Sequence, residues 1–173
     1  MQQAEQLRAP AKIGGQATAD FCDRYPSAQV IQQSFRNFGA QALCLGPVET
    51  VSTRDDNSVV KRILQEQGAG RVLLVDNCGS TTCAMLGGSL AKLAADNGWA
   101  GVVVNGAVRD VDEIRATPVA VFALATCPRK SSKRGIGTVG KPVRIGGLLI
   151  HSGDLLAADN DGIAVLPSWA ARH

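Results

Sequence analysis

Residues 71–110 read RVLLVDNCGSTTCAMLGGSLAKLAADNGWAGVVVNGAVRD, and their pattern decides the fold. The stretch begins with an apolar run over residues 71–76, which is typical of a buried strand. Apolar residues then recur at helical spacing over residues 90–98, where a glycine ends the pattern. Another apolar run follows at residues 102–104 and closes on an asparagine and a glycine. A strand, a helix and a strand in this order predict two parallel strands joined by a right-handed crossover.

Shorter elements flank this unit on both sides. The residue pattern predicts helices over residues 18–25 and 57–68 and one that starts near Asp110, and strands at residues 40–45, 48–51, 119–124 and within 143–166. Gly46 and Pro47 separate two of these runs and predict a turn between paired strands. Short strands around a parallel crossover predict an α/β domain, in which a mixed sheet is layered with helices and with a second, antiparallel sheet.

The length and the composition point to one globular domain. The chain has 173 residues, of which 45% are hydrophobic and 19% charged, a balance that excludes a disordered protein. Its N-terminal end is polar and rich in alanine and glutamine. We therefore expect residues 1–17 to form a flexible leader and residues 18–173 to form the single domain.

Charge and cysteine content narrow the class of protein further. The net charge of +3 is small for a nucleic-acid surface, and one Tyr, two Trp and four Phe offer few rings for stacking on bases. A dedicated nucleic-acid surface is therefore not expected. Five cysteines form an odd set in a chain that needs no disulfides, so buried, reduced thiols are expected. The two histidines form no zinc pattern with them, and a metal would therefore need oxygen ligands. No signal peptide and no membrane-spanning stretch is evident, so the expected location is the cytoplasm.

The best candidate site follows the apolar run at residues 102–104. There the chain presents a cation and a carboxylate side by side, Arg109 and Asp110. Ligands bind at the carboxyl ends of strands in open α/β sheets, an arginine fork suits a carboxylate or an enolate, and an aspartate suits Mg²⁺ or Mn²⁺. A simpler interpretation is that Asp110 caps a helix and Arg109 is solvated.

Several segments of the chain resemble the regulator of ribonuclease activity A family. The resemblance extends over about residues 18–166 and rests on the signature at residues 98–113, the strand at 71–76, the C-terminal motif at 153–163 and the turn at Phe38-Gly39. It implies a three-layer β/β/α domain of the swivelling type and a homotrimer, which in some members forms a dimer of trimers. Sites in this family lie near subunit contacts.

One branch of this family resembles 4-hydroxy-4-methyl-2-oxoglutarate aldolase, which releases two pyruvates and also decarboxylates oxaloacetate. Both reactions pass through a pyruvate enolate. The resemblance implies that Asp110 anchors Mg²⁺ or Mn²⁺, which polarises the 2-oxo group of a small 2-oxo acid, and that Arg109 binds the developing oxyanion.

The same resemblance assigns a substrate-binding turn to Gly87, Gly88, Ser89 and Leu90. Glycines before a helix leave N–H groups available for an anion, although the same segment also suits a plain helix start. The aldolase branch has an acidic residue at the position of Gly88, so turnover depends on another acid. Asp112 and Glu113 are candidates, as is a carboxylate of a neighbouring subunit, although acids on a helix face are more often solvated.

The other branch of the family resembles a regulator that binds and inhibits ribonuclease E, and this is the alternative function. Its partner would be that ribonuclease or its helicase, and catalysis would not be needed. The presence of Asp110 favours a metal site mildly over this interpretation.

Two other patterns carry less weight. The glycine motif at residues 135–140 lacks the strand before it and the helix after it that a dinucleotide site requires. Four cations at residues 129, 130, 133 and 134 form a basic loop that could attract an anionic substrate, RNA or an acidic partner, although such a loop is usually solvated and has a modest electrostatic role.

Overall fold

The structure is a computed structural model that describes residues 17–172, so most of the predicted leader lies outside the described residues. The helices are α1 (Thr18–Arg24), α2 (Ser58–Leu64), α3 (Gly88–Asp96), α4 (Val111–Arg115) and a short C-terminal 3-10 helix, η1 (Ala170–Arg172). The strands are β1 (Gln29–Val30), β2 (Arg36–Asn37), β3 (Cys44–Ser52), β4 (Val72–Asp76), β5 (Ala84–Leu86), β6 (Gly101–Val108), β7 (Ala120–Thr126), β8 (Thr138–Val139), β9 (Val143–Ile145), β10 (Leu148–Ile150), β11 (Leu155–Asp159) and β12 (Gly162–Leu166).

The parallel unit predicted from residues 71–110 is present at the centre of the sheet. β3, β4, β6 and β7 lie side by side and run parallel, and β4 pairs with β6 from Val72 opposite Gly101 to Asp76 opposite Asn105. The helix between β4 and β6 is α3, which ends before Gly98, a residue with a φ of +74°. β6 is longer than the apolar run alone indicates, because it continues through Asn105 to Val108.

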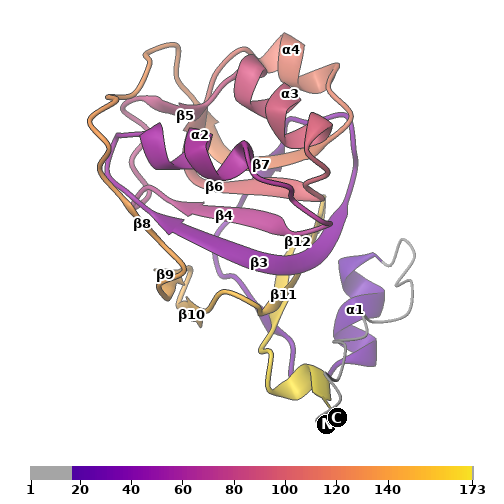
Figure 1. The fold of residues 1–173 in the computed structure, drawn as a ribbon. Helices are drawn as coiled ribbons and strands as arrows, with labels where there is room; N and C mark the ends of the chain where they lie inside the picture. The colour runs from indigo at the N-terminus through magenta and orange to yellow at the C-terminus, as the bar shows by residue number, and fades with distance from the viewer. Residues whose placement is uncertain (1–16, 173) are drawn as a thin grey trace, which may run out of the picture.

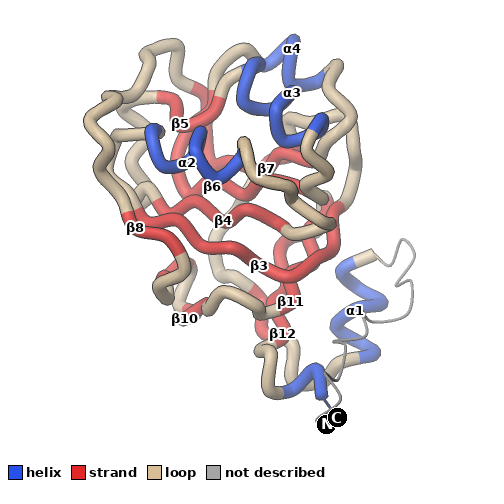
Figure 2. The backbone as a smooth tube through the Cα atoms, viewed as in Figure 1, coloured by secondary structure: helices blue, strands red, loops and turns tan. Residues whose placement is uncertain are grey.

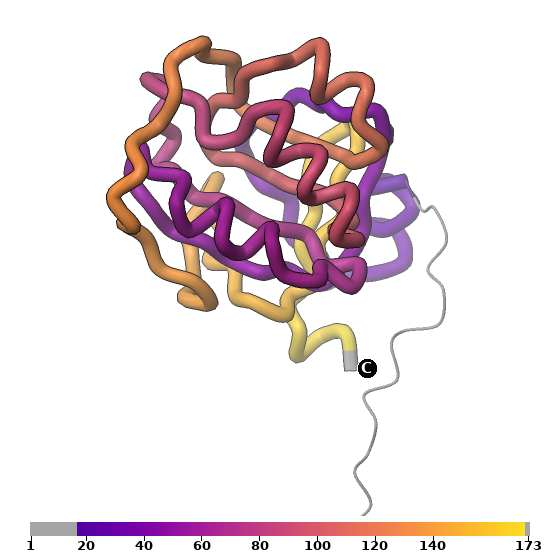
Figure 3. The backbone as a smooth tube through the Cα atoms, turned by 45° about the horizontal axis from the view of Figure 1, so that its top comes forward, coloured from indigo at the N-terminus to yellow at the C-terminus, as the bar shows by residue number. Residues whose placement is uncertain are grey.

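The elements form three layers, so the predicted β/β/α arrangement is confirmed. α2, α3 and α4 cover one face of the central strands, and Figure 3 shows α2 and α3 side by side across it. β9 to β12 cover the opposite face (Figure 1). Alternate residues of the central strands face the two cores. Leu73 and Val75 pack under the helices, and Leu74 packs against the layer of β9 to β12. This is the period of two that a strand buried on both faces requires.

One predicted feature is wrong, since residues 40–51 do not form two strands around a turn. β3 runs through Gly46 and Pro47 without a break, and its tube can be followed in Figure 2. The first part of β3 pairs with β11, and from Val48 onward it pairs with β4. Pro47 lies where the partner strand changes, and Gly46 has no side chain because a Cβ there would lie 2.1 Å from the carbonyl oxygen of Gly70.

The start of α2 is set by a buried carboxylate. Asp56 is fully buried, and its carboxylate accepts hydrogen bonds from the backbone N–H and the hydroxyl of Ser58 and from the N–H of Arg134. The predicted caps, Asn57 and Ser58, therefore do not cap with their own side chains. Gly68 is not the C-terminal glycine of this helix, because α2 ends at Leu64 and Gly68 packs against Trp99.

The five thiols are free and differ in burial. Cys44 and Cys83 are buried, Cys22 and Cys127 are half-buried, and Cys78 is exposed, so the prediction of buried thiols holds for two of them. Burial raises the pKa of Cys44 to about 12. Within residues 17–172, no helix has the length and the apolar character needed to cross a membrane.

Candidate functional site

Arg109 and Asp110 lie at the carboxyl end of β6, as predicted. Every residue of β6 is buried, and the chain reaches the surface only after Val108. The Arg109 N–H donates to the carbonyl of Leu86 at 3.0 Å, and the Val108 carbonyl accepts from the Cys127 N–H at 3.0 Å. The end of the strand is therefore fixed between β5 and the chain after β7.

Asp110 has an unusual backbone for a residue with a side chain. Its φ of 58° and ψ of 46° lie in the left-handed region, which aspartate tolerates better than most residues. It precedes α4, but its carboxylate caps no N–H of that helix. Instead, Oδ2 accepts a hydrogen bond of 3.1 Å from the N–H of Gly88 in α3. The simple interpretation of Asp110 as a cap of its own helix is therefore wrong, and a strained backbone is typical of functional positions.

A small cavity of about 120 Å³ opens beside these two residues. Its lining comes from α2, β5, the start of α3, the end of β6 and the basic loop: Asn57, Lys61, Ala84, Gly87, Ser89, Leu90, Arg109, Asp110, Lys130, Ser131 and Lys133. Four of these side chains are cationic and only Asp110 is acidic. The cavity thus suits a small anion that carries more than one negative charge, together with a cation on Asp110.

Three lysines line this cavity that were not among the predicted site residues. Lys133 donates to the Asn57 side-chain oxygen at 3.1 Å, and the Asn57 amide donates to the Met85 carbonyl at 3.3 Å. Lys130 is brought in by a bridge with Ala84. The four cations of residues 129–134 were the available signal, but only the tertiary contacts of this loop show that it closes the cavity.

The predicted substrate-binding turn lies where expected, at the start of α3. Gly87, Ser89 and Leu90 line the cavity, whereas Gly88 is buried beside it. The first N–H groups of a helix have no partner within the helix, and the one on Gly88 is already used by Asp110. A Cβ on Gly87 would lie 2.7 Å from Asp110 Oδ2, so a side chain there would displace the Asp110 carboxylate.

The two acids that were candidates to replace a carboxylate at position 88 have different surroundings in the structure. Asp112 is fully exposed and lies 3.9 Å from Arg115. Glu113 folds back over α3, and a Cβ on Gly88 would lie only 2.1 Å from Glu113 Oε2. Glu113 is therefore next to Gly88, and Asp112 has a partner of its own on α4.

The residues at the cavity fit a divalent cation of the kind that keeps much of its water. No group of three or more His, Cys, Asp or Glu side chains could enclose a metal in residues 17–172. Mg²⁺, however, is usually held through one or two carboxylates and retains several waters, and Mn²⁺ accepts the same oxygen ligands. Asp110 is exposed and offers an oxygen ligand of this type at the cavity.

Cys83 precedes the cavity residue Ala84, and its thiol is held in the protonated form. Burial raises the pKa of Cys83 to about 11, and the neighbouring Asp55 carboxylate raises it too. Asp55 accepts a hydrogen bond from the Cys83 thiol at 3.3 Å. Because the nucleophile in cysteine catalysis is the thiolate, a thiol held protonated in this way does not serve as one.

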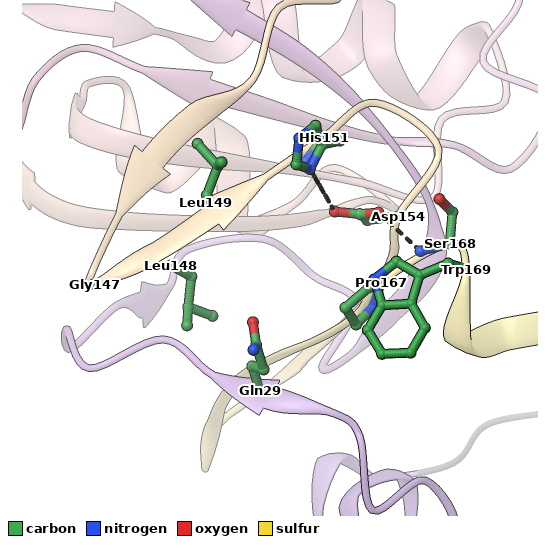
Figure 4. Close-up of a pocket in the computed structure, with 9 residues that line it drawn as sticks. All are labelled: Gln29, Gly147, Leu148, Leu149, His151, Asp154, Pro167, Ser168 and Trp169. Carbon is green, nitrogen blue, oxygen red and sulfur yellow. Dashed lines mark hydrogen bonds and ion pairs between the residues drawn. The ribbon is translucent and has the colours of Figure 1, made fainter.

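A larger cavity of about 570 Å³ lies elsewhere, between β10 and the C-terminal segment (Figure 4). Its one buried carboxylate, Asp154, is already occupied, since it accepts from the N–H groups of His151 at 2.8 Å and Ser168 at 2.9 Å. The cavity is wide and includes the exposed side chains of Leu149 and Trp169. It offers little chemistry beyond one imidazole, and its apolar rim is more typical of a contact surface.

The chain matches the model of a known protein family. The RraA-like family, described as Aldolase/RraA, matches residues 18–165. The 4-hydroxy-4-methyl-2-oxoglutarate aldolase of Thermus thermophilus is 46% identical over 150 residues, which cover 87% of this chain and 92% of the relative.

Two solved structures share the fold of this chain. The RNA-processing inhibitor RraA of Thermus thermophilus aligns with a TM-score of 0.86 at 44% identity, covering 88% of this chain and 93% of the other. The S-adenosylmethionine:2-dimethylmenaquinone methyltransferase of Geobacillus kaustophilus aligns with the same TM-score at 38% identity, covering 88% and 95%. The three names differ, so the activity of this chain has to be argued from its site.

Proposed function

Because the chain belongs to the RraA-like family, we propose that it is a lyase that cleaves small 2-oxo acids with the help of a divalent cation. The observation that carries this proposal is the pairing of Arg109 with Asp110 in a small cavity whose other charged side chains are all lysines. The aldolase name of the relative with 46% identity supports it. The substrates proposed are 4-hydroxy-4-methyl-2-oxoglutarate and, as a side activity, oxaloacetate.

The residues of the cavity divide the work of such a reaction. In the cleavage, the 4-hydroxyl gives its proton to solvent water and becomes the carbonyl of one pyruvate as the C3–C4 bond breaks. The electron pair of that bond forms the enolate of the second pyruvate, which then takes a proton from water at C3. Arg109 presents its guanidinium to the carboxylate and oxyanion of that pyruvate unit. Lys61, Lys130 and Lys133 hold the remaining carboxylate and keep the dianion in place.

A divalent cation, Mg²⁺ or Mn²⁺, would be held by Asp110 and would act as a Lewis acid on the 2-oxo oxygen. Asp110 is itself held in place by the Gly88 N–H. This contact leaves the other carboxylate oxygen of Asp110 for the cation.

Release of pyruvate tests this function. The wild type is expected to release pyruvate from both substrates with Mg²⁺ or Mn²⁺, and to stop when EDTA is added. Asp110→Asn is expected to lose at least 100-fold in rate, because the anchoring charge is gone. The matched control is Asp112→Asn, an exposed acid two residues away. Turnover that survives both EDTA and Asp110→Asn would disprove the metal-dependent lyase.

A second candidate function is binding and inhibition of ribonuclease E, without catalysis. The likeness to the RNA-processing inhibitor RraA favours it, as does the exposure of Arg129 and Arg134 beside the cavity. A pull-down with ribonuclease E or its helicase at moderate salt tests it, with charge reversal of these two arginines as the control. Absence of any complex would leave the lyase as the only candidate.

We also propose that the chain forms a homotrimer in the cytoplasm, with pairing of trimers into a hexamer as a further possibility. Two large apolar side chains are exposed at the wide cavity of Figure 4: Leu149 and Trp169. Apolar groups gathered in this way are typical of contact surfaces. The free thiols support a reducing compartment.

A further inference from the structure

Position 88 is a glycine whose missing side chain leaves space that another residue fills. An ideal Cβ built on Gly88 would lie 2.1 Å from Glu113 Oε2 and 2.9 Å from the Glu113 Cβ and Cδ atoms. Real side chains never approach so closely, so Glu113 rests directly on the Cα of Gly88. The contact joins the first turn of α3 to the first turn of α4.

The same glycine also touches the other carboxylate of the site. The Gly88 N–H donates to Asp110 Oδ2 at 3.1 Å while its Cα is covered by the Glu113 carboxylate. Asp110 and Glu113 are three residues apart and both lean onto one residue of α3. Two carboxylates are thus held against the N-terminal end of that helix, where the helix dipole favours negative charge.

Glu113 has no other task in the described part of the chain. No hydrogen bond or ion pair in residues 17–172 involves its carboxylate, whereas its backbone carbonyl accepts from the Ala116 N–H and the Thr117 hydroxyl. Glu113 and its neighbour Asp112 are both exposed, but only Asp112 has a cationic partner, Arg115, on the same helix. The position of Glu113 therefore does not follow from a salt bridge on its own helix.

We propose that Glu113 is a second carboxylate that supports the cation site of Asp110 through a bound water, and that position 88 is a glycine to make room for it. The proposal rests on the function proposed above and names a positioning residue for it. Four cationic side chains surround Asp110 in the cavity and repel a metal ion. A second carboxylate offsets that repulsion, and Mg²⁺ sites commonly use one or two carboxylates.

The direct test is the affinity for Mn²⁺ alone, measured by electron paramagnetic resonance and by titration calorimetry without substrate. Glu113→Gln keeps the size of the side chain and removes its charge. We expect it to weaken Mn²⁺ binding by about 10- to 100-fold, the usual loss when a supporting group of a metal site is removed. Asp112→Asn is the matched control and is expected to stay within about twofold of the wild type, since its carboxylate is screened by water.

A second variant tests the geometry and leaves Glu113 itself intact. Gly88→Ala keeps the N–H that binds Asp110 but places a methyl group where Glu113 lies. It is expected to weaken Mn²⁺ binding about as much as Glu113→Gln does, and the double variant is expected to be no weaker than either single one. Circular dichroism of each variant verifies that the fold is kept.

The outcomes separate this inference from the proposed function. If Asp110→Asn abolishes Mn²⁺ binding while Glu113→Gln and Gly88→Ala leave it within twofold, the role of Glu113 is wrong and the site stands. If the wild type does not bind Mn²⁺ at millimolar concentration, the proposed function itself fails.

Discussion

Arg109 owes its position to contacts that do not involve any ligand. Its backbone is tied to Leu86, and its Nη1 donates to the carbonyl of Pro128 at 3.4 Å. The backbone of Arg109 is therefore fixed, and its guanidinium has one contact at the cavity, before a substrate arrives. A positioned guanidinium loses little conformational freedom on binding. Its planar fork therefore binds an anion more tightly than a mobile ammonium group does.

This argument predicts the effect of Arg109→Lys. The lysine keeps the charge but loses the fork and the contact with Pro128. We expect kcat/KM for oxaloacetate to fall by about 100-fold, the usual range for loss of an oxyanion donor. Steady-state pyruvate release measures it, with Arg134→Lys on the exposed part of the basic loop as the control. Equal activity of the two variants would remove Arg109 from the reaction.

At the scale of the elements, the edge of the sheet depends on a close approach of two backbones. Gly39 follows β2, and a Cβ there would lie 2.0 Å from the Val119 carbonyl oxygen and 2.8 Å from the Val121 nitrogen. The neighbouring Phe38 N–H donates to the Val121 carbonyl at 2.7 Å. The chain after β2 therefore packs on β7 only if residue 39 has no side chain.

Gly39→Ala is expected to lower the free energy of unfolding by about 1–3 kcal/mol, because two backbone segments have to separate to admit one methyl group. Urea unfolding followed by circular dichroism at pH 7 measures the change. Gln41→Ala, a substitution of an exposed side chain two residues away, serves as control. An unchanged midpoint for Gly39→Ala would show that the edge yields without strain.

The basic loop depends on the buried carboxylate of Asp56. Burial alone would raise the pKa of this group, but the hydrogen bonds from Ser58, Arg134 and Ile136 outweigh burial, so its pKa lies below the ordinary value of 3.8. A lowered pKa stabilises the fold fully above about pH 4 and loses this contribution as the pH falls through the folded-state pKa. The loop that carries Lys130 and Lys133 is thus fixed to α2 at neutral pH.

Asp56→Asn is expected to cost about 1–3 kcal/mol at pH 7, because an amide cannot accept all the hydrogen bonds that the carboxylate accepts. Urea unfolding at several pH values between 7 and 3 should show the gap to the wild type narrowing below about pH 4. Asp23→Asn on the exposed face of α1 is the control. A gap that stays constant with pH would mean that Asp56 is not ionised in the folded protein.

At the scale of the whole molecule, the exposed apolar groups at the wide cavity bear on assembly. Light scattering after size exclusion is expected to give about three times the 18.0 kDa of the single chain, or twice that trimer mass. Leu149→Asp and Trp169→Asp place a charge in the proposed contact and are expected to shift the mass toward the single chain. Ile136→Asp, an equally exposed apolar position outside that cavity, is the control. A wild type of single-chain mass would overturn the trimer.

The sequence allowed the central layers to be predicted because their signals are local. β4, α3, β6, α4 and β7 each show their own period and caps within a few residues. β1, β2, β5 and β8 escaped prediction because two or three residues carry no period, and their pairing partners lie far along the chain. β3 was divided at Gly46-Pro47 because these residues usually mark a turn, whereas here they mark a change of partner strand.

The residues of the candidate site also differ in how well the sequence predicts them. Arg109 and Asp110 could be predicted because they follow an evident strand, and Gly87 to Leu90 because glycines precede an evident helix. Lys61 and Lys133 could not, since their neighbourhood is created by a loop that returns to α2 through Asp56.

The contact between Gly88 and Glu113 also has an evolutionary consequence. One small volume between α3 and α4 admits a single side chain, which either helix can provide. Among aligned relatives we therefore expect the two positions to covary, with a short residue at 113 wherever position 88 has a side chain. Some relatives would then carry the carboxylate on α3 and others on α4, with the negative charge at the same place in the fold.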